Sequence, residues 1–256
     1  MKNSNKKKIV AALDIGSSKI CCAVASIKDE HSLEILSFAE RKSFGIRSGE
    51  IESIRDCEDA VTNVIHDAEK FAKIKIDSIV TNISTKSIKG LTIEKEIKIT
   101  NQFVRDKDIE NVFALVKTEY ENENIQLLHI SPIQYYLDDK RFDKAPIDEQ
   151  GDILKIHIHL VTIFYKDIIK LHKLLDECNI DTLNSSVILS PYASALAVLN
   201  ENEKKEGVIC IDFGSETTSI VFFHNEALMY TSVLPVGGKL ISKDIVEVFQ
   251  TPFLQA

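Results

Sequence analysis

Apolar and polar positions alternate along the first forty residues in three short runs. The runs cover residues 8–13, 19–27 and 32–40, and polar turns at 14–18 and 28–31 separate them. Alternation with a period of two is typical of β-strands, and short polar connections join neighbouring strands of a sheet. The chain is therefore predicted to begin with a three-stranded meander.

A helical period replaces this alternation after Ser53. Ser53 with Asp56 three residues later is the kind of pair that caps a helix N-terminus. Apolar residues then recur every three or four positions, as on one face of a helix, at Ile54, Cys57, Val61, Val64, Ala68 and Phe71. A helix is predicted here, followed by a strand at residues 79–83.

The region from about residue 84 to 164 is rich in alternating lysine, glutamate and isoleucine. A Lys/Glu-rich alternation covers 88–100, and the pattern after it predicts a helix at 105–120 and strands near 126–130, 133–137 and 152–164. We interpret this region as an inserted α+β subdomain.

The last strand of this region alternates cleanly. Leu154, Ile156, Ile158 and Leu160 are expected to face inward, and Lys155, His157 and His159 to form an exposed face. Two histidines two residues apart on a strand can also hold a metal ion, but no third ligand is evident.

The remainder of the chain is predicted to contain a helix, a strand and a helix, and then a second meander. The helices are expected at 166–178 and 192–199, the second opened by Ser190 and Pro191, with a strand at 182–188 between them. A charged loop at 200–205 is expected to lead to strands at 207–212, 219–223 and 227–234 and to a helix from 239 to about 250.

Composition narrows the class of protein. The 256 residues are 44% hydrophobic and 27% charged, as in globular domains, and the net charge of -8 argues against a nucleic-acid partner. The basic run Lys6–Lys8 is interpreted as a solvated leader. Five cysteines without a C-x-x-C pair indicate a reduced cytoplasm, and no stretch approaches the length of a membrane-spanning helix.

An internal repeat is the most informative feature. Residues 9–20 and 208–220 share one pattern, in which an apolar strand is followed by Asp-x-Gly, a cluster of hydroxyl residues and a second apolar strand. An aspartate at a strand end can hold Mg²⁺ through water, and glycine lets backbone N–H groups approach phosphate oxygens. Two such hairpins that face each other would bind the phosphates and metal of a nucleotide from both sides.

The candidate nucleotide-binding residues follow from this repeat. They are Asp14, Gly16, Ser17, Ser18 and Lys19 in the first hairpin, Asp212, Gly214, Ser215, Thr217 and Thr218 in the second, and Gly237 and Gly238 before the last helix. Asp14 and Asp212 are the candidate metal ligands. Each glycine could instead serve an ordinary tight turn, and each hydroxyl residue is common in β-structure.

These motifs resemble the actin, sugar-kinase and Hsp70 superfamily and, within it, the bacterial cell-division family FtsA. Residues 13–19 resemble its first phosphate motif, 212–218 its second, 234–245 the stretch that follows, and 191–199 the helix that links the two halves. The resemblance implies an α/β, actin-like (ribonuclease H-like) ATPase fold with an inserted α+β subdomain and an incomplete second half. It divides the chain into a first-domain core at 1–84, the inserted subdomain at 85–164, a return to the core at 165–200 and the start of a second domain at 201–256.

The resemblance also implies a cellular role. It suggests a scaffold of the division septum that binds ATP and Mg²⁺, self-associates and recruits other division proteins through residues 85–164, at the cytoplasmic face of the membrane. In this family the adenosine motif, the region that binds FtsZ and the amphipathic membrane helix lie beyond the position matched by residue 256.

The second hairpin departs from the family pattern. Ser215 and Glu216 replace two glycines, Ser219 replaces an aspartate, and Ser190 stands where many members have a glutamine. A carboxylate beside phosphates is unfavourable unless it turns away or binds the metal. We therefore expect weak or absent ATP hydrolysis. A non-enzymatic interaction module with a degenerate cleft remains the alternative, and a small-molecule kinase of the same fold would need a catalytic aspartate that no motif supplies.

Overall fold

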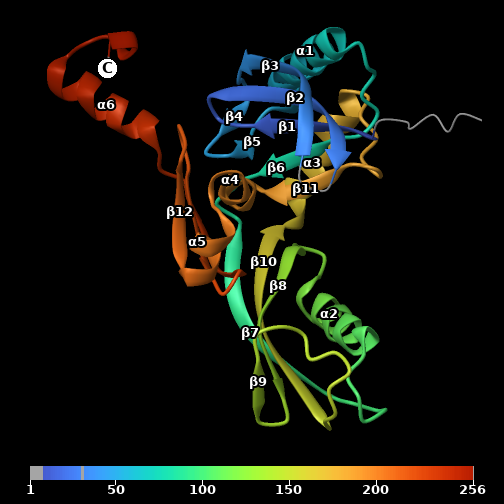
Figure 1. Ribbon diagram of the computed structural model, residues 1–256. Coiled ribbons are helices and arrows are strands. Elements are labelled where there is room, and N and C mark those ends of the chain that lie inside the picture. Colours follow the sequence, from blue (N-terminus) through green and yellow to red (C-terminus); the bar gives the residue numbers. More distant parts are fainter. Residues whose placement is uncertain (1–7, 30–31, 256) are drawn as a thin grey trace, which may run out of the picture.

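The computed structural model describes residues 8–29 and 32–255. Part of the basic leader (Lys6 and Lys7) and the end of the loop at 28–31 lie outside them. The structure has an upper and a lower body in the view of Figure 1, with a β-meander beside them and a helix that projects away.

The upper body contains a five-stranded sheet with the order β11-β6-β1-β2-β3. The predicted meander forms its antiparallel part, whereas the other two strands run parallel to β1 and to each other. The bounds are β1 (Lys8–Ile15), β2 (Lys19–Asp29), β3 (Ser32–Lys42), β6 (Val80–Ile83) and β11 (Ser186–Leu189). Two short strands, β4 (Ile46–Arg47) and β5 (Glu50–Ile51), form a hairpin that the sequence pattern did not predict.

Two helices cover one side of this sheet, α1 (Ile54–Ala72) and α3 (Tyr165–Glu177). The predicted cap of α1 is confirmed, because the Ser53 side chain accepts a hydrogen bond from the Asp56 N–H. Five of the six predicted apolar positions pack as expected, whereas Phe71 is 65% exposed. In the last turn of α1, Ala72 rather than Phe71 packs against the core.

A seven-stranded sheet with the order β12-β13-β14-β7-β10-β8-β9 runs through the lower body and the meander. The inserted region contributes β7 (Lys89–Lys98), α2 (Asp106–Tyr120), β8 (Ile125–Leu137), β9 (Lys140–Phe142) and β10 (Ile153–Phe164). The two strands predicted at 126–130 and 133–137 are one strand, whose register shifts opposite His157 and Ile158. A separate hydrophobic core holds this region together, and Leu154, Ile156, Ile158 and Leu160 lie in it as predicted.

The end of the chain contains α4 (Ser190–Val198), α5 (Glu201–Glu206), β12 (Val208–Phe213), β13 (Thr218–His224), β14 (Ala227–Leu234), α6 (Gly238–Phe249) and η1 (Phe253–Gln255). The prediction of a loop at 200–205 was wrong, because Asn200 and Glu203 form a capping box that begins a short helix. The strand predicted from residue 182 begins four residues later, because the Asp181 carboxylate accepts hydrogen bonds from two following N–H groups and holds a turn.

The inserted region and the final meander meet at a narrow joint. β14 pairs with β7 only at Ser232 and Lys89. Beside this pair the His159 ring is 1% exposed, and its Nε2 lies 3.2 Å from the Thr231 hydroxyl oxygen. The prediction that His159 belongs to an exposed face was therefore wrong, because the final meander covers it.

The other two residues of that predicted face remain at the surface, where Lys155 and His157 both contact the Glu94 carboxylate. Among the described residues no group of three potential ligands is placed to hold a metal ion.

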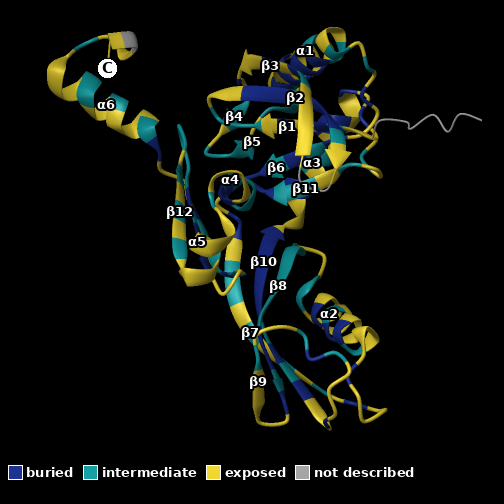
Figure 2. Ribbon diagram, in the orientation of Figure 1, coloured by how far each residue is buried: buried dark blue, intermediate teal, exposed yellow. Residues whose placement is uncertain are grey.

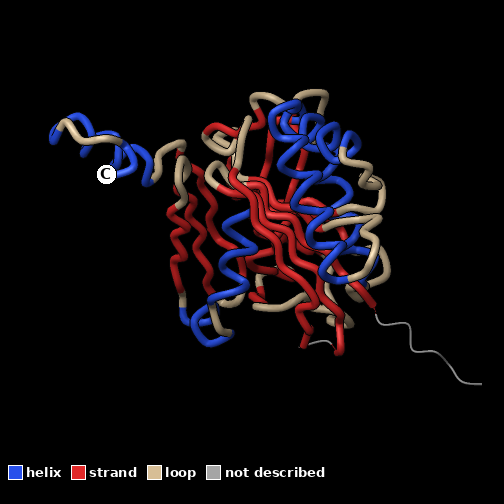
Figure 3. Tube along the Cα trace, turned by 90° about the horizontal axis from the view of Figure 1, so that it is seen from above, coloured by secondary structure: helices blue, strands red, loops and turns tan. Residues whose placement is uncertain are grey.

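Helix α6 differs from the other long helices in having no buried residue. Figures 1 and 3 both show it standing away from the sheets, and Figure 2 shows its surface as exposed or partly exposed. Its N-terminus is nevertheless fixed to the second hairpin by hydrogen bonds. In the part of the chain that the structure describes, no helix is long and apolar enough to span a bilayer.

Candidate functional site

The two predicted phosphate hairpins line one cavity of about 230 Å³. The turn between β1 and β2 and the turn between β12 and β13 each close with a backbone hydrogen bond, from Gly16 to Lys19 and from Gly214 to Thr217. The cavity is lined by Asp14, Ile15, Gly16, Ser17, Ser18, Lys19, Asp212, Gly214, Ser215 and Thr217, together with Gly49, Asn82, Ser84, Ser190 and Ser219. The structure thus brings together nine of the twelve predicted nucleotide-binding residues.

Asp14 is held in place by Asn82, a residue that the sequence analysis missed. The Asn82 amide group donates a hydrogen bond to Asp14 Oδ1, and the Asn82 Oδ1 accepts one from the Ile15 N–H at 3.0 Å. Asn82 can reach both because β6 runs parallel to β1. A polar residue near the end of the predicted strand at 79–83 was the available signal, but it became meaningful only once that strand was known to lie beside β1.

Asp212 is oriented from the linking helix. The Ser194 hydroxyl on α4 donates a hydrogen bond of 2.8 Å to Asp212 Oδ2. Across the cavity the hydroxyl oxygens of Ser84 and Ser219 lie 3.0 Å apart. Ser219, which stands where the family pattern has an aspartate, therefore joins the second hairpin to the first half of the chain.

Three predicted residues do not line this cavity. The Thr218 hydroxyl donates to the Val236 carbonyl at 2.7 Å. The N–H groups of Gly238 and Lys239, at the start of α6, donate to the carbonyls of Gly214 and Ser215 at 3.0 and 2.8 Å. A Cβ on Gly237 would lie 2.5 Å from the Gly214 oxygen, so glycine is needed where the helix meets the hairpin. The glycine pair joins α6 to the turn.

Lys19 lines the cavity, but its ammonium group pairs with Glu40 on β3 at 3.1 Å. The hydrogen bond to Glu40 raises the pKa of the Lys19 side chain. Asp14 and Asp212 are the carboxylate residues among those that line the cavity. Mg²⁺ is usually bound by one or two carboxylates together with water and substrate phosphates, so this donor set fits a magnesium–nucleotide complex.

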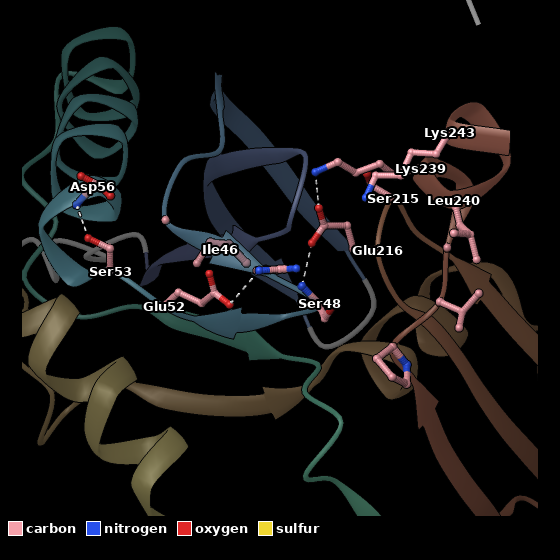
Figure 4. A pocket seen from close by; sticks show the side chains of 15 residues that line it. Ile46, Ser48, Glu52, Ser53, Asp56, Ser215, Glu216, Lys239, Leu240 and Lys243 are labelled. Carbon is pink, nitrogen blue, oxygen red and sulfur yellow. Dashed lines mark hydrogen bonds and ion pairs between the residues drawn. The ribbon is translucent and has the colours of Figure 1, made fainter. Parts of the chain in front are cut away.

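A second cavity of about 550 Å³ opens beside the first, between the β4–β5 hairpin and α6. Figure 4 shows Glu216 directed toward Ser48 and Lys239. Its carboxylate accepts a 2.7 Å hydrogen bond from the Ser48 N–H and forms an ion pair with the Lys239 ammonium group. Glu216 therefore turns away from the first cavity, one of the outcomes that the sequence analysis allowed.

The turn between β4 and β5 contacts both hairpins. The Gly49 N–H donates to the Ser17 hydroxyl at 3.1 Å, while the preceding N–H, of Ser48, binds Glu216. Ser48 and Gly49 both have positive φ, of 48° and 75°. A Cβ on Gly49 would lie 1.7 Å from the Ser84 carbonyl oxygen, so this position requires glycine.

Comparison with solved structures identifies the fold class. The chain is similar to a structure of the PilM-PilN type IV pilus biogenesis complex, with a TM-score of 0.64, 16% identity and coverage of 96% of this chain and 67% of that one. It is also similar to the ethanolamine utilization protein EutJ from Carboxydothermus hydrogenoformans, with a TM-score of 0.55 and 12% identity over 100% of this chain and 62% of that one. With the paired hairpins, these similarities define a protein of the actin-like ATPase fold.

Sequence comparison identifies the family. The model of cell division protein FtsA matches residues 209–256, and the model of the SHS2 domain inserted in FtsA matches residues 85–162. The chain is 30% identical to cell division protein FtsA of Neisseria meningitidis serogroup B over 247 residues, and 31% identical to that of Buchnera aphidicola subsp. Baizongia pistaciae over 251. It belongs to the FtsA family of bacterial cell-division proteins. The aligned region covers 96% and 98% of this chain but 59% of each of these relatives.

Proposed function

We propose that the cavity between the two hairpins binds ATP together with Mg²⁺. The observation that supports this proposal is that both copies of the repeat, almost 200 residues apart in sequence, line one cavity with their aspartates, glycines and hydroxyl groups. Asp14 and Asp212 would hold the metal through water. Ser17, Ser18 and Thr217 would donate hydrogen bonds to phosphate oxygens. The ion would neutralise phosphate charge when bound.

We expect the protein to hydrolyse ATP bound in this cavity slowly or not at all. Hydrolysis requires a polar group that positions water for attack on the γ-phosphate. Ser190 lines the cavity at the position where many family members have a glutamine, whose longer side chain carries both a hydrogen-bond donor and an acceptor. A serine side chain is two bonds shorter, so we expect it to leave the attacking water poorly positioned.

The proposed cellular role is that of a scaffold of the division septum. FtsA-family membership supports self-association, recruitment of other division proteins through residues 85–164 and work at the cytoplasmic face of the membrane, whereas the family's contact with FtsZ uses a region beyond the position matched by residue 256. The proposed organisation is a first-domain core at 1–84 and 165–200, the inserted subdomain at 85–164, and the start of the second domain at 201–256.

A specific observation favours the alternative of a non-enzymatic interaction module. Glu216 already provides an anion to Ser48 and Lys239 beside the phosphate cavity. If this carboxylate cannot be displaced, the chain would keep the fold and the inserted subdomain but would bind nucleotide poorly.

Thermal unfolding with Mg²⁺, with and without millimolar ATP, separates the two proposals. A ligand that binds only the folded state stabilises it by RT ln(1 + [L]/Kd), about 2.7 kcal/mol at a hundredfold excess over Kd. We expect ATP to stabilise the unchanged chain and Asp139→Ala, a charge-matched control on an exposed turn, but not Asp14→Ala. No stabilisation of any of the three would refute nucleotide binding and leave the interaction module.

A further inference from the structure

Glu216 connects three segments that are far apart in the sequence. It follows β12, whereas Ser48 lies between β4 and β5 in the first half of the chain and Lys239 lies on α6. The Glu216 side chain is 11% exposed, and the Lys239 side chain is 44% exposed. The carboxylate is therefore enclosed between the two halves, and its two partners approach from opposite sides (Figure 4).

The charges around Glu216 favour its ionised form. Burial acts to raise the pKa of its carboxyl group, but the hydrogen bonds from Lys239 and Ser48 and the charges of Lys239 and Arg47 outweigh burial and lower the pKa. Glu216 is thus a fixed anion at neutral pH. Hydrogen bonds to an ionised acceptor are about twice as strong as those between neutral groups.

The groups that bind Glu216 are of the kind that bind phosphate. Ser48 and Gly49 have successive positive φ angles, as in a tight two-residue hairpin turn, and their N–H groups bind acceptors outside the β4–β5 hairpin. Here the Ser48 N–H binds Glu216 and the Gly49 N–H binds Ser17, which is itself a phosphate-hairpin residue. Arg47, Lys239 and Lys243 line the same cavity. The site therefore has the donors and cations of a phosphate site, and a side chain of the protein supplies the anion.

We propose that Glu216 is an internal latch, an anion that joins the β4–β5 turn to the second hairpin and α6 without ligand and competes for the Ser48 N–H and Lys239 with a nucleotide phosphate that extends from the first cavity into the adjoining second one. This inference rests on the proposed nucleotide site and deepens it by naming a residue that regulates entry. In the latched state, the contacts of Glu216 with Ser48 and Lys239 hold the two halves together without a bound nucleotide. A phosphate group can bind in the second cavity only if Glu216 yields at least one of these partners.

The latch is tested first without nucleotide, by hydrogen exchange at the Ser48 amide. Glu216→Ala removes the acceptor, so this amide should exchange about tenfold faster or more, since tenfold corresponds to about 1.4 kcal/mol. Glu52→Ala is the matched control, because Glu52 lines the same cavity with the same charge but contacts Arg47 at 3.9 Å. Equal protection of Ser48 in the unchanged chain and Glu216→Ala would overturn the latch.

The second measurement is ATP affinity with Mg²⁺, by calorimetry. Glu216→Ala should bind ATP about tenfold more tightly or better, because a competing anion is removed. Lys239→Gln should bind more weakly, because it leaves the carboxylate unneutralised. Only Glu216→Ala removes the acceptor of the Ser48 N–H, so Ser48 should stay protected in Lys239→Gln, and a general loss of folding would instead weaken ATP binding and Ser48 protection in both variants.

The outcomes distinguish the latch from the nucleotide proposal. Faster Ser48 exchange without ATP binding in any variant would support the latch as a structural connection and refute the nucleotide site. ATP binding with equal affinity in the unchanged chain and Glu216→Ala would support the nucleotide site and overturn the proposed competition.

Discussion

Acidification is expected to lower the free energy of unfolding through protonation of His159, which lies at the joint between the inserted region and the final meander. The ring is 1% exposed, Nε2 contacts Thr231, and Nδ1 has no hydrogen-bond partner. Burial lowers the pKa of this imidazole from the usual 6.5 to about 4. Between these pH values the unfolded chain binds more protons than the folded one. The contribution of His159 is therefore complete above about pH 6.5 and is lost as the pH falls toward and through 4.

The size of the effect follows from the two pKa values. Each pKa unit corresponds to about 1.36 kcal/mol, so a fall from 6.5 to about 4 represents roughly 3 kcal/mol of unfolding free energy. Most of this, roughly 2 kcal/mol, should be lost between pH 7 and 4.5. This is a large share of the 5–15 kcal/mol that stabilises a typical domain.

Urea unfolding at pH 7 and 4.5 measures the loss. In His159→Leu the loss between the two pH values should be smaller than in the unchanged chain by roughly 2 kcal/mol, whatever the constant cost of the substitution. His157→Leu, two residues away on the same strand and partly exposed, is the control and should keep the original pH dependence. Other titratable groups, including the partly buried His129, contribute equally to each comparison. The same pH dependence in His159→Leu and the unchanged chain would refute the reasoning.

Three further predictions concern other parts of the structure. Gly49→Ala places a Cβ against the Ser84 carbonyl at a positive φ and should lower the unfolding free energy by about 1–3 kcal/mol or more, measured by urea unfolding. Asn82→Ala removes the hydrogen bond that orients Asp14 and should weaken ATP binding about tenfold in calorimetry with little change in stability. Ile156→Ala leaves a cavity in the core of the inserted region and should cost about 2–5 kcal/mol, with β8 and β10 amides losing hydrogen-exchange protection first.

Local sequence signals predicted those elements whose structure is determined by residues close to one another in the sequence. The Ser53 cap predicted the start of α1, and the Asp-x-Gly repeat predicted two strand–turn–strand hairpins that the structure contains. These features depend on residues within a few positions of one another. The sequence therefore specified most element types and the pairing of neighbouring strands.

Features that depend on distant residues were not predicted. His159 has the alternation of an exposed position, but Thr231, 72 residues later on β14, covers it. Asn82 orients Asp14 only because β1 and β6, which β2–β5 and α1 separate in the sequence, lie side by side. The role of Glu216 likewise depends on a turn 168 residues away. Contacts of this kind leave no period or spacing in the sequence.

The strand β10 has a mechanical consequence. Its 12 residues rise about 3.3 Å each, so it forms a rod of about 40 Å, flanked by β7 and β8 and leading directly into α3 at Tyr165. A hydrogen-bonded strand resists stretching, and no flexible linker separates it from the helix. A force applied to the distal end of the inserted region would therefore be transmitted along β10 to α3, and from α3 to α1, which packs against it.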